Sequence, residues 1–161
     1  MRYVILFLLT ILFPASASAN CEVNFAEAEK NYAIPKGYLS AISRTEVGVG
    51  QTGKLRSWAL NVAGDAIYFR DKYAAAQYLA VLDIQNIDIG CMQINKNWHG
   101  ERFLSKSHML DPYQNVMYAA YLLRRHYNET RSWERSIKFY HSRNPQFHNK
   151  YYEKFKMNIG Q

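Results

Sequence analysis

The chain has 161 residues, of which 48% are hydrophobic and 20% are charged, and its formal net charge is +7 at pH 7. This composition excludes an intrinsically disordered chain, and the length suits a single domain with its own core. The positive charge suits an anionic partner, although a basic surface that only keeps the protein soluble is an equally good reading.

Residues 1–19 are predicted to be a removable export signal. Arg2 supplies a short positive start, residues 4–13 form an apolar run, and Ala17-Ser18-Ala19 gives an A-x-A cleavage site. The run is too short to span a membrane, and no later segment approaches 18 consecutive apolar residues. We therefore expect residues 20–161 to be a periplasmic or secreted domain without stable membrane insertion.

Export also guides the interpretation of the charge and of the two cysteines. An exported protein rarely meets nucleic acid, so the charge favours an anionic cell-wall polymer. An even number of cysteines in an oxidising compartment favours pairing, and we predict a disulfide between Cys21 and Cys91. The alternative is two unpaired thiols. A lipid anchor at Cys21 is rejected, because Asn20 stands where lipoprotein signals have a small Gly, Ala or Ser.

Capping and turn signals predict about six helices. The expected helices cover residues 24–33, 35–48, 72–82, 112–127, 132–140 and 147–156. Asn24 with Glu27 resembles a capping box, and Pro35 suits the first position of the second helix. The later caps are Asp71, Asp111 and Ser132.

The stretch from Trp58 to Arg70 contains the only strand signal. Two short apolar runs flank Ala63-Gly64-Asp65, which predicts one small β-hairpin with Asp65 in its turn. Residues 86–99 are expected to form a loop with a short helical turn. The predicted fold class is α+β and mostly α.

Glu46 is the leading candidate for chemistry. Its spacing from Leu39 and Ile42 places it on the apolar side of the second helix, near the C-terminus and before a glycine-rich segment that could open a cleft. Partial desolvation and the negative end of the helix both favour the protonated carboxyl, which suits a general acid. The plain alternative is a solvated residue at a helix end.

Four motifs occur in a characteristic order along the chain. They are Thr45-Glu46-Val47-Gly48, Gly90-Cys91-Met92-Gln93-Ile94-Asn95, Tyr118-Ala119-Ala120 and Phe139-Tyr140-His141-Ser142. Together they resemble the lytic transglycosylase family with the lysozyme-like SLT fold, over residues 32–152. The stretch 86–95, followed by Trp98-His99-Gly100 and Phe103, is similar to small exported members that serve a secretion, conjugation or flagellar apparatus.

The resemblance implies peptidoglycan glycan strands as substrate and gives roles to several residues. Glu46 would be the single catalytic acid/base, Gln93 and Asn95 would line the sugar groove, and Tyr140 would place its hydroxyl near the carboxylate. Tyr151 matches a further tyrosine of the fold.

Three positions depart from the family pattern. Val47 stands in place of the usual Ser, so hydroxyl support for Glu46 must come from elsewhere. Cys91 replaces a Leu and His141 replaces an Asn, which affects details of the groove.

Ordinary glycosidases need a second carboxylate, and none of the 13 acidic residues is an obvious partner for Glu46. Asp65, Asp83, Asp88 and Glu101 remain after caps and surface helices are set aside, and Asp88 is assigned to a turn or cap beside Gly90. One carboxylate suffices if the N-acetyl group of the substrate assists, which would give 1,6-anhydro sugar ends without water. The alternatives are a hydrolytic muramidase of the same fold and a non-catalytic peptidoglycan-binding assembly factor.

Other chemistries find no support in the sequence. The five histidines show no metal-ligand spacing, and no G-x-S-x-G nucleophile motif is present. We expect neither a metal nor a cofactor.

Overall fold

The computed structural model describes residues 20–161, so the predicted export signal lies outside the described residues. The helices in this part are α1 Glu22–Asn31, α2 Tyr38–Val47, α3 Lys72–Val81, α4 Lys96–His99, a 3-10 helix Gly100–Arg102, α5 Lys106–Met109, α6 Pro112–Thr130, α7 Trp133–His141 and α8 Pro145–Asn158. Four strands, β1 Ala59–Val62, β2 Asp65–Tyr68, β3 Ile87–Ile89 and β4 Ile94–Asn95, form one antiparallel sheet in the order β2-β1-β3-β4. The predicted mostly-α α+β class is confirmed.

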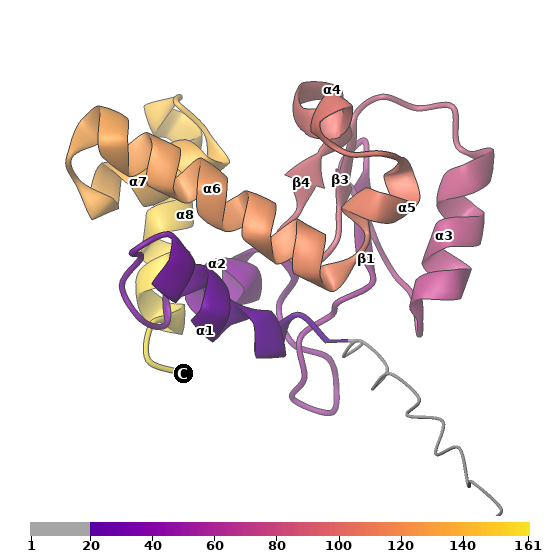
Figure 1. Cartoon of the computed structure of the whole chain (residues 1–161), viewed down its shortest axis with the longest axis horizontal. Helices are drawn as coiled ribbons and strands as arrows, with labels where there is room; N and C mark the ends of the chain where they lie inside the picture. The colour runs from indigo at the N-terminus through magenta and orange to yellow at the C-terminus, as the bar shows by residue number, and fades with distance from the viewer. Residues whose placement is uncertain (1–19) are drawn as a thin grey trace, which may run out of the picture.

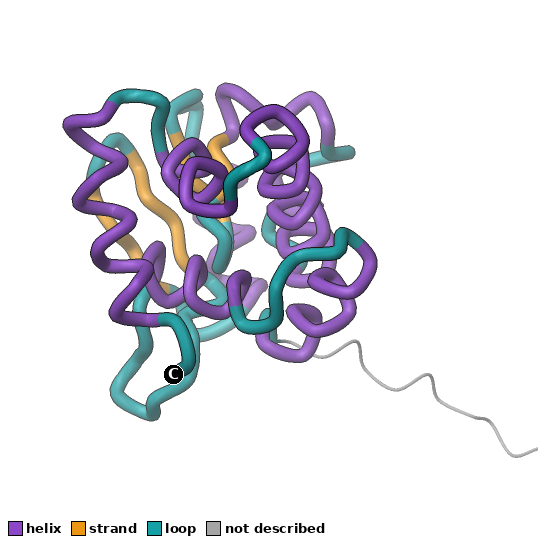
Figure 2. Tube along the Cα trace, turned by 90° about the vertical axis from the view of Figure 1, so that its left-hand side faces the viewer, coloured by secondary structure: helices purple, strands orange, loops and turns teal. Residues whose placement is uncertain are grey.

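Helix α6 divides the molecule. Figure 1 shows α1, α2, α7 and α8 on one side of it and the sheet with α3 on the other, and Figure 2 shows the strands enclosed among helices. Its buried face carries Val116, Ala119, Ala120 and Leu123 at spacings of three and four residues. Among residues 20–161, no helix combines the length and apolar character that a membrane span requires.

The three later N-caps are confirmed. In each of them the capping side chain accepts a hydrogen bond from a backbone N–H of the first turn. The pairs are Asp71 with Ala74, Asp111 with Gln114 and Ser132 with Arg135.

The predicted start of the first helix is wrong. Helix α1 begins at Glu22, and Asn24 lies inside it rather than at its cap. The Asn20 side-chain oxygen accepts from the Glu22 amide at 2.9 Å, while the disulfide holds Cys21 at the helix start. The chain is therefore fixed two residues earlier than the local pattern suggests.

The second helix, in contrast, begins later than predicted, at Tyr38 instead of Pro35. The buried Glu29 carboxylate of α1 accepts hydrogen bonds from the Gly37 amide at 3.0 Å and the Leu39 amide at 2.9 Å. Free N–H groups at a helix start need such acceptors. The cap comes from a neighbouring helix, which local sequence signals do not report.

The predicted hairpin is confirmed as β1 and β2, but Asp65 is the first residue of β2 rather than part of the turn. The turn is Ala63-Gly64, with both φ angles positive. The assignment of residues 86–99 to a loop is wrong in part, because β3 and β4 lie within it, whereas the short helical turn predicted there is confirmed as α4. Strands of three and two residues are too short to show a pattern, and they form because β3 pairs with β1.

The turn between β3 and β4, residues 90–93, is held by Asn115. Its side chain accepts from the Met92 amide at 2.9 Å and donates to the carbonyls of Ile89 at 2.8 Å and Met109 at 2.9 Å. Gly90 has φ +80°, and a Cβ there would lie 2.7 Å from Asn115. Only glycine fits at this position.

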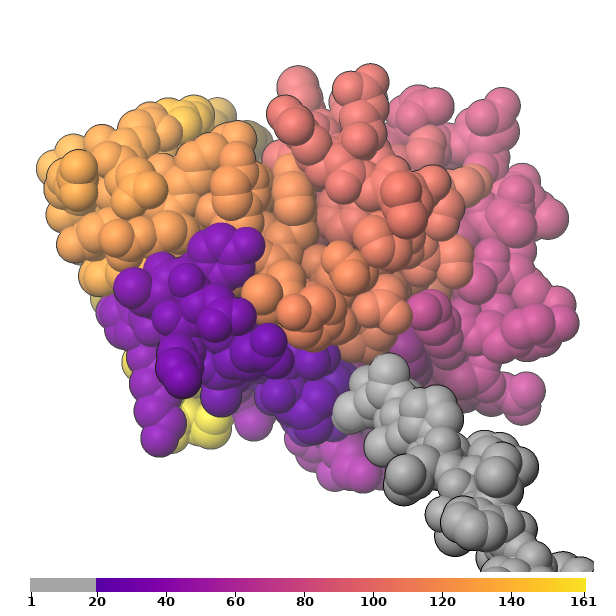
Figure 3. Space-filling model, in the orientation of Figure 1, coloured from indigo at the N-terminus to yellow at the C-terminus, as the bar shows by residue number. Residues whose placement is uncertain are grey.

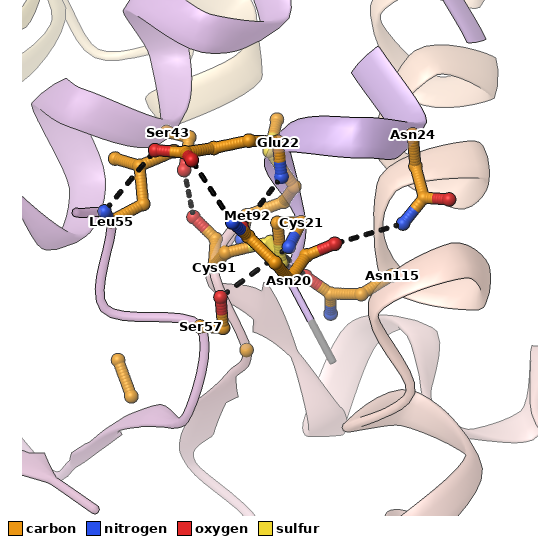
Figure 4. The surroundings of a disulfide bond; sticks show 12 residues. Asn20, Cys21, Glu22, Asn24, Ser43, Leu55, Ser57, Cys91, Met92 and Asn115 are labelled. Atoms are coloured by element: carbon orange, nitrogen blue, oxygen red, sulfur yellow. Dashed lines mark hydrogen bonds between the residues drawn. A yellow bond between two sulfur atoms is a disulfide. The ribbon is translucent and has the colours of Figure 1, made fainter. Parts of the chain in front are cut away.

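The predicted disulfide between Cys21 and Cys91 is confirmed, and both residues are fully buried. It joins the start of α1 to the turn 90–93, as Figure 4 shows. Ser43 of α2 donates to the Cys91 carbonyl at 3.0 Å, which adds a second attachment. The bond closes a loop across 70 positions of sequence.

The disulfide should account for a large part of the stability. Closing a loop of this length is worth roughly 4 kcal/mol in the chain-entropy model. We expect Cys21→Ala/Cys91→Ala and the reduced wild type to melt well below the oxidised protein. Thiol titration of the unfolded, unreduced protein should find no free thiol. Two reactive thiols, or an unchanged melting temperature, would contradict the bridge.

Candidate active site

A polar pocket of about 380 Å³ lies where the helical side meets the sheet. Its lining comes from α2, β1, β3, the turn 90–93, β4, α4, α6 and α7. The residues are Glu46, Asn61, Asp88, Gln93, Ile94, Asn95, Trp98, His99, Leu122, Tyr140 and His141. In Figure 1, α4 and α7 lie on either side of the upper edge of the molecule, and both contribute residues to the lining of the pocket. All four residues assigned to catalysis or sugar binding from the sequence therefore meet in one pocket.

Glu46 lies in the last turn of α2, on the pocket wall. Removal of its carboxyl from water raises the pKa of Glu46 from 4.5 to about 8. The Tyr151 hydrogen bond lowers this pKa and the negative charge of Asp88 raises it. Desolvation is the largest effect, so the carboxyl holds its proton at neutral pH.

Tyr151 supplies the hydroxyl that Val47 lacks. Its phenol donates to Glu46 Oε1 at 2.8 Å from α8, and Val47 itself is buried in the core. The His141 ring stacks on the Tyr151 ring with centroids 4.4 Å apart and planes 2° apart. The stack fixes the phenol, and thereby the carboxyl, in one orientation.

Tyr140 lines the same pocket as Glu46, and its hydroxyl makes a hydrogen bond to the opposite wall. It donates to the Met92 carbonyl at 2.8 Å, so its hydrogen bond goes to the turn 90–93 and not to Glu46. Burial, followed by the charges of Glu46 and Asp88, holds the pKa of Tyr140 well above its usual value. The phenol therefore stays neutral beside the carboxyl and links α7 to the turn.

Gln93 and Asn95 line the pocket while also stabilising its wall. Gln93 has φ +47° and its amide donates to the Gly90 carbonyl at 2.9 Å, across the turn. The Asn95 amide donates to Asp88 Oδ1 at 2.7 Å, and its oxygen accepts from the Trp98 amide at the start of α4. Asn95 thus connects the second carboxylate to the helix that carries Trp98.

Asp88 is the main correction to the sequence-based site. It is neither a turn residue nor a cap, because it lies in β3 opposite Asn95 and faces the pocket that contains Glu46. Burial raises the pKa of Asp88, and the Asn95 hydrogen bond opposes this effect. The negative charge of Asp88 in turn raises the pKa of Glu46. Alternation along Ile87-Asp88-Ile89 turns Asp88 away from its buried neighbours, but a strand of three residues is too short to be recognised from the sequence.

Trp98 and His99 were noted only as part of a motif and were given no role. Trp98 is 78% exposed although it is a large aromatic residue, and it borders the pocket. His99 lines the pocket, and burial together with the charges of Arg125 and Arg102 lowers its pKa, which keeps it neutral. An exposed Trp beside a polar pocket offers an apolar face to a sugar ring. Within residues 20–161 no three His, Cys, Asp or Glu side chains group in a way that could hold a metal ion.

A protonated carboxyl in a polar pocket can give its proton to a glycosidic oxygen, and an exposed aromatic side chain at the border can pack on a sugar ring. The family model described as Transglycosylase SLT domain matches residues 23–156, and the chain belongs to this family. Membership agrees with the mostly helical fold and small sheet, which are lysozyme-like, and connects the protein with peptidoglycan. Neither a curated protein nor a solved structure matched the chain.

The Tyr151 hydrogen bond can be tested through the titration of Glu46. Because the phenol stabilises the charged carboxylate, Tyr151→Phe should raise the pKa of Glu46 above its value of about 8. A hydrogen bond of about 1 kcal/mol corresponds to a shift of about 0.7 units. Carboxyl NMR titration measures it directly. The adjacent Tyr152→Phe is the matched control, since it is Tyr151 and not Tyr152 that donates to the Glu46 carboxyl. An unchanged or lower pKa in Tyr151→Phe would refute the assigned contact.

Proposed function

We propose that the protein is a peptidoglycan lytic transglycosylase with Glu46 as its acid/base. The reaction cleaves the β-1,4 bond between N-acetylmuramic acid and N-acetylglucosamine and leaves 1,6-anhydro ends. The observation that carries the proposal is the Glu46 carboxyl, which keeps its proton up to about pH 8 and accepts the Tyr151 hydrogen bond. A general acid must hold its proton at the working pH.

The first step is proton donation. Glu46 gives its proton to the glycosidic oxygen, the bond to C1 breaks, and positive charge develops on the muramic acid ring. The N-acetyl carbonyl oxygen of the same sugar stabilises C1, as in substrate-assisted glycosidases. The charge that appears on Glu46 is stabilised by the Tyr151 phenol, which is already aligned and needs no reorganisation.

The second step returns the proton. The Glu46 carboxylate takes the proton of the C6 hydroxyl, and O6 attacks C1 to close the 1,6-anhydro ring. Glu46 is protonated again, and no water is consumed. One residue therefore acts first as acid and then as base.

The hydrolytic alternative is a muramidase, and Asp88 is the observation that favours it. The absence of a second carboxylate no longer supports the transglycosylase reading, because Asp88 and Glu46 line the same pocket. In its charged form, Asp88 can stabilise positive charge at C1 in either reaction. What separates the two reactions is the group that attacks C1, O6 or water.

A non-catalytic assembly factor is less well supported. Val47 replaces the usual Ser of the family, and loss of that hydroxyl would be consistent with loss of catalysis. Tyr151, however, provides a hydroxyl contact to Glu46 in its place. For the cellular role, we propose export to the periplasm and local wall remodelling around a secretion, conjugation or flagellar apparatus. This role rests on the likeness of residues 86–103 to exported family members.

Digestion of purified peptidoglycan tests the reaction. The protein of residues 20–161 should release muropeptides that end in 1,6-anhydro-muramic acid, lighter by one water than muramidase products. Mass analysis of the fragments decides the matter. Reducing ends alone would replace this proposal by the muramidase.

Glu46→Gln is the control for that digestion. We expect a loss of activity on the order of 100-fold or more, which is typical when a general acid/base is removed. Folding raises the pKa of Glu46, so the wild-type protein loses stability as the pH rises from 4.5 toward 8. Gln avoids this loss, and the variant should be more stable at pH 7 by on the order of 1 kcal/mol, after allowance for partial exposure. If both proteins bind sacculi and neither cleaves them, the assembly factor is correct.

Asp88→Asn separates the two enzyme mechanisms further. Removing its negative charge should lower the pKa of Glu46, so the loss of activity at high pH should begin at a lower pH than in the wild type. The anhydro products should remain, at a reduced rate. The exposed Asp83→Asn is the matched control. Complete loss of activity in Asp88→Asn, with reducing ends from the wild type, would assign Asp88 to a hydrolytic mechanism.

A further inference from the structure

The end of helix α2, next to Glu46, is held by a side chain from outside the helix. Arg56 Nη1 donates a hydrogen bond to the Val47 carbonyl at 2.8 Å. Val47 is the last residue of α2, and the last carbonyls of a helix have no partner within the helix. A positive charge at this end also opposes the negative end of the helix dipole. Arg56 therefore caps the turn that carries Glu46.

The Arg56 guanidinium is also held by an aromatic ring of the sheet. Arg56 Cζ lies 4.4 Å from the centroid of the Tyr68 ring, and Tyr68 is the last residue of β2. A guanidinium over an aromatic face gains a cation–π interaction, and its planar group can stack and donate a hydrogen bond at the same time. One side chain thus joins the helix of Glu46 to the hairpin β1–β2.

Gly48 leaves the space that this contact needs. Its φ angle is +62°, and a Cβ at this position would lie 3.1 Å from Arg56 Nη1. Beyond Gly48 the chain forms a loop, residues 48–58, that is closed by a β-bridge between Val49 and Leu55. Figures 1 and 3 show this loop as a purple projection at the lower edge of the molecule. The loop returns Arg56 to the helix end from which it started.

Arg56 lies outside the catalytic pocket. It lines a separate hollow of about 440 Å³, together with Tyr68 and Arg70, and it is not among the residues that line the pocket of Glu46. Any effect of Arg56 on the reaction must therefore pass through α2. The Glu46 carboxyl is aligned with the Tyr151 hydroxyl at 2.8 Å, and this alignment requires an ordered last turn of α2.

We propose that Arg56 is a positioning residue for Glu46, which deepens the proposed function and rests on it. The contacts with the Val47 carbonyl and the Tyr68 ring keep the last turn of α2 from fraying. Glu46 consequently stays in place both when it gives its proton and when it takes the proton back. A displacement of about 1 Å at a reacting group can cost about 100-fold in rate.

Kinetics with peptidoglycan tests this role. We expect Arg56→Gln to lower kcat by about tenfold or more, because the acid is misplaced, and to leave KM within about twofold, because substrate binding is retained. Arg56→Lys should lie between Arg56→Gln and the wild type, since an ammonium can donate to the carbonyl but cannot stack in the same way. Arg70→Gln is the matched control and should equal the wild type, because Arg70 lines the same hollow and pairs with Asp71.

Amide hydrogen exchange gives a readout that does not depend on catalysis. The Gly48 amide donates to the Arg44 carbonyl at 3.0 Å and closes the last turn of α2. Its exchange rate, followed by NMR, should rise by about tenfold in Arg56→Gln and stay unchanged in Arg70→Gln. Tyr68→Leu removes the ring and keeps the guanidinium, so it should change kcat and the exchange rate in the same direction by a smaller factor.

The proposal requires the loss of kcat and the faster Gly48 exchange to occur together, and either result without the other would overturn it. A raised KM at unchanged kcat in Arg56→Gln would place Arg56 against the substrate, which also overturns a positioning role. Equal losses in Arg56→Gln and Arg70→Gln would indicate a general effect on the fold. If the wild type cleaves no peptidoglycan, the proposed reaction fails, whereas the Gly48 exchange rate still shows whether Arg56 holds the end of α2.

Discussion

The turn at residues 90–93 is the constraint on which the rest of the structure depends. Asn115 holds it from α6, Ser43 from α2, Tyr140 from α7 and the disulfide from the start of α1. These contacts attach one short turn to four helices, and the turn leads directly into the strand that carries Asn95. A shift of the turn would move the wall of the pocket relative to Glu46, which explains why buried hydrogen bonds and a covalent bond converge there.

The electrostatic environment of Glu46 lowers the stability of the fold near neutral pH and keeps the carboxyl protonated, as proton donation requires. Desolvation and the charge of Asp88 raise the pKa of Glu46 and keep it neutral, whereas the hydrogen bond from Tyr151 stabilises the charged carboxylate and lowers this pKa. A carboxyl held in this way destabilises the fold near neutral pH relative to a neutral amide. The neighbouring phenols of Tyr140 and Tyr151 also remain protonated, since burial raises the pKa of each. The Glu46 carboxyl thus lies beside two neutral phenols and shares its pocket with a second carboxyl, that of Asp88.

Helix α6 forms part of the wall of the catalytic pocket. Leu122 lines the pocket, and Tyr118, four residues earlier on the same face of the helix, lies with its hydroxyl 3.2 Å from Nδ1 of His99, which also lines the pocket. The buried stripe of α6 fixes its rotation against the core. A single packed helix therefore fixes this part of the pocket wall relative to the core.

The sequence by itself determined the mostly helical class, the β1–β2 hairpin, the three later N-caps, the cysteine pair and the four motif residues that meet in the pocket. Those features follow from local periodicity, capping chemistry and recognisable motifs, which are written in neighbouring positions. Only the tertiary structure decided the Glu29 cap of α2, the strands β3 and β4, the Tyr151 contact with Glu46 and the place of Asp88. Each of these depends on partners far apart in the chain. The amides at the start of α2 find their acceptor in another helix, and the three-residue strand β3 forms only beside β1. The environment that sets the pKa of Glu46 likewise comes from distant segments, so sequence pattern alone does not report these features.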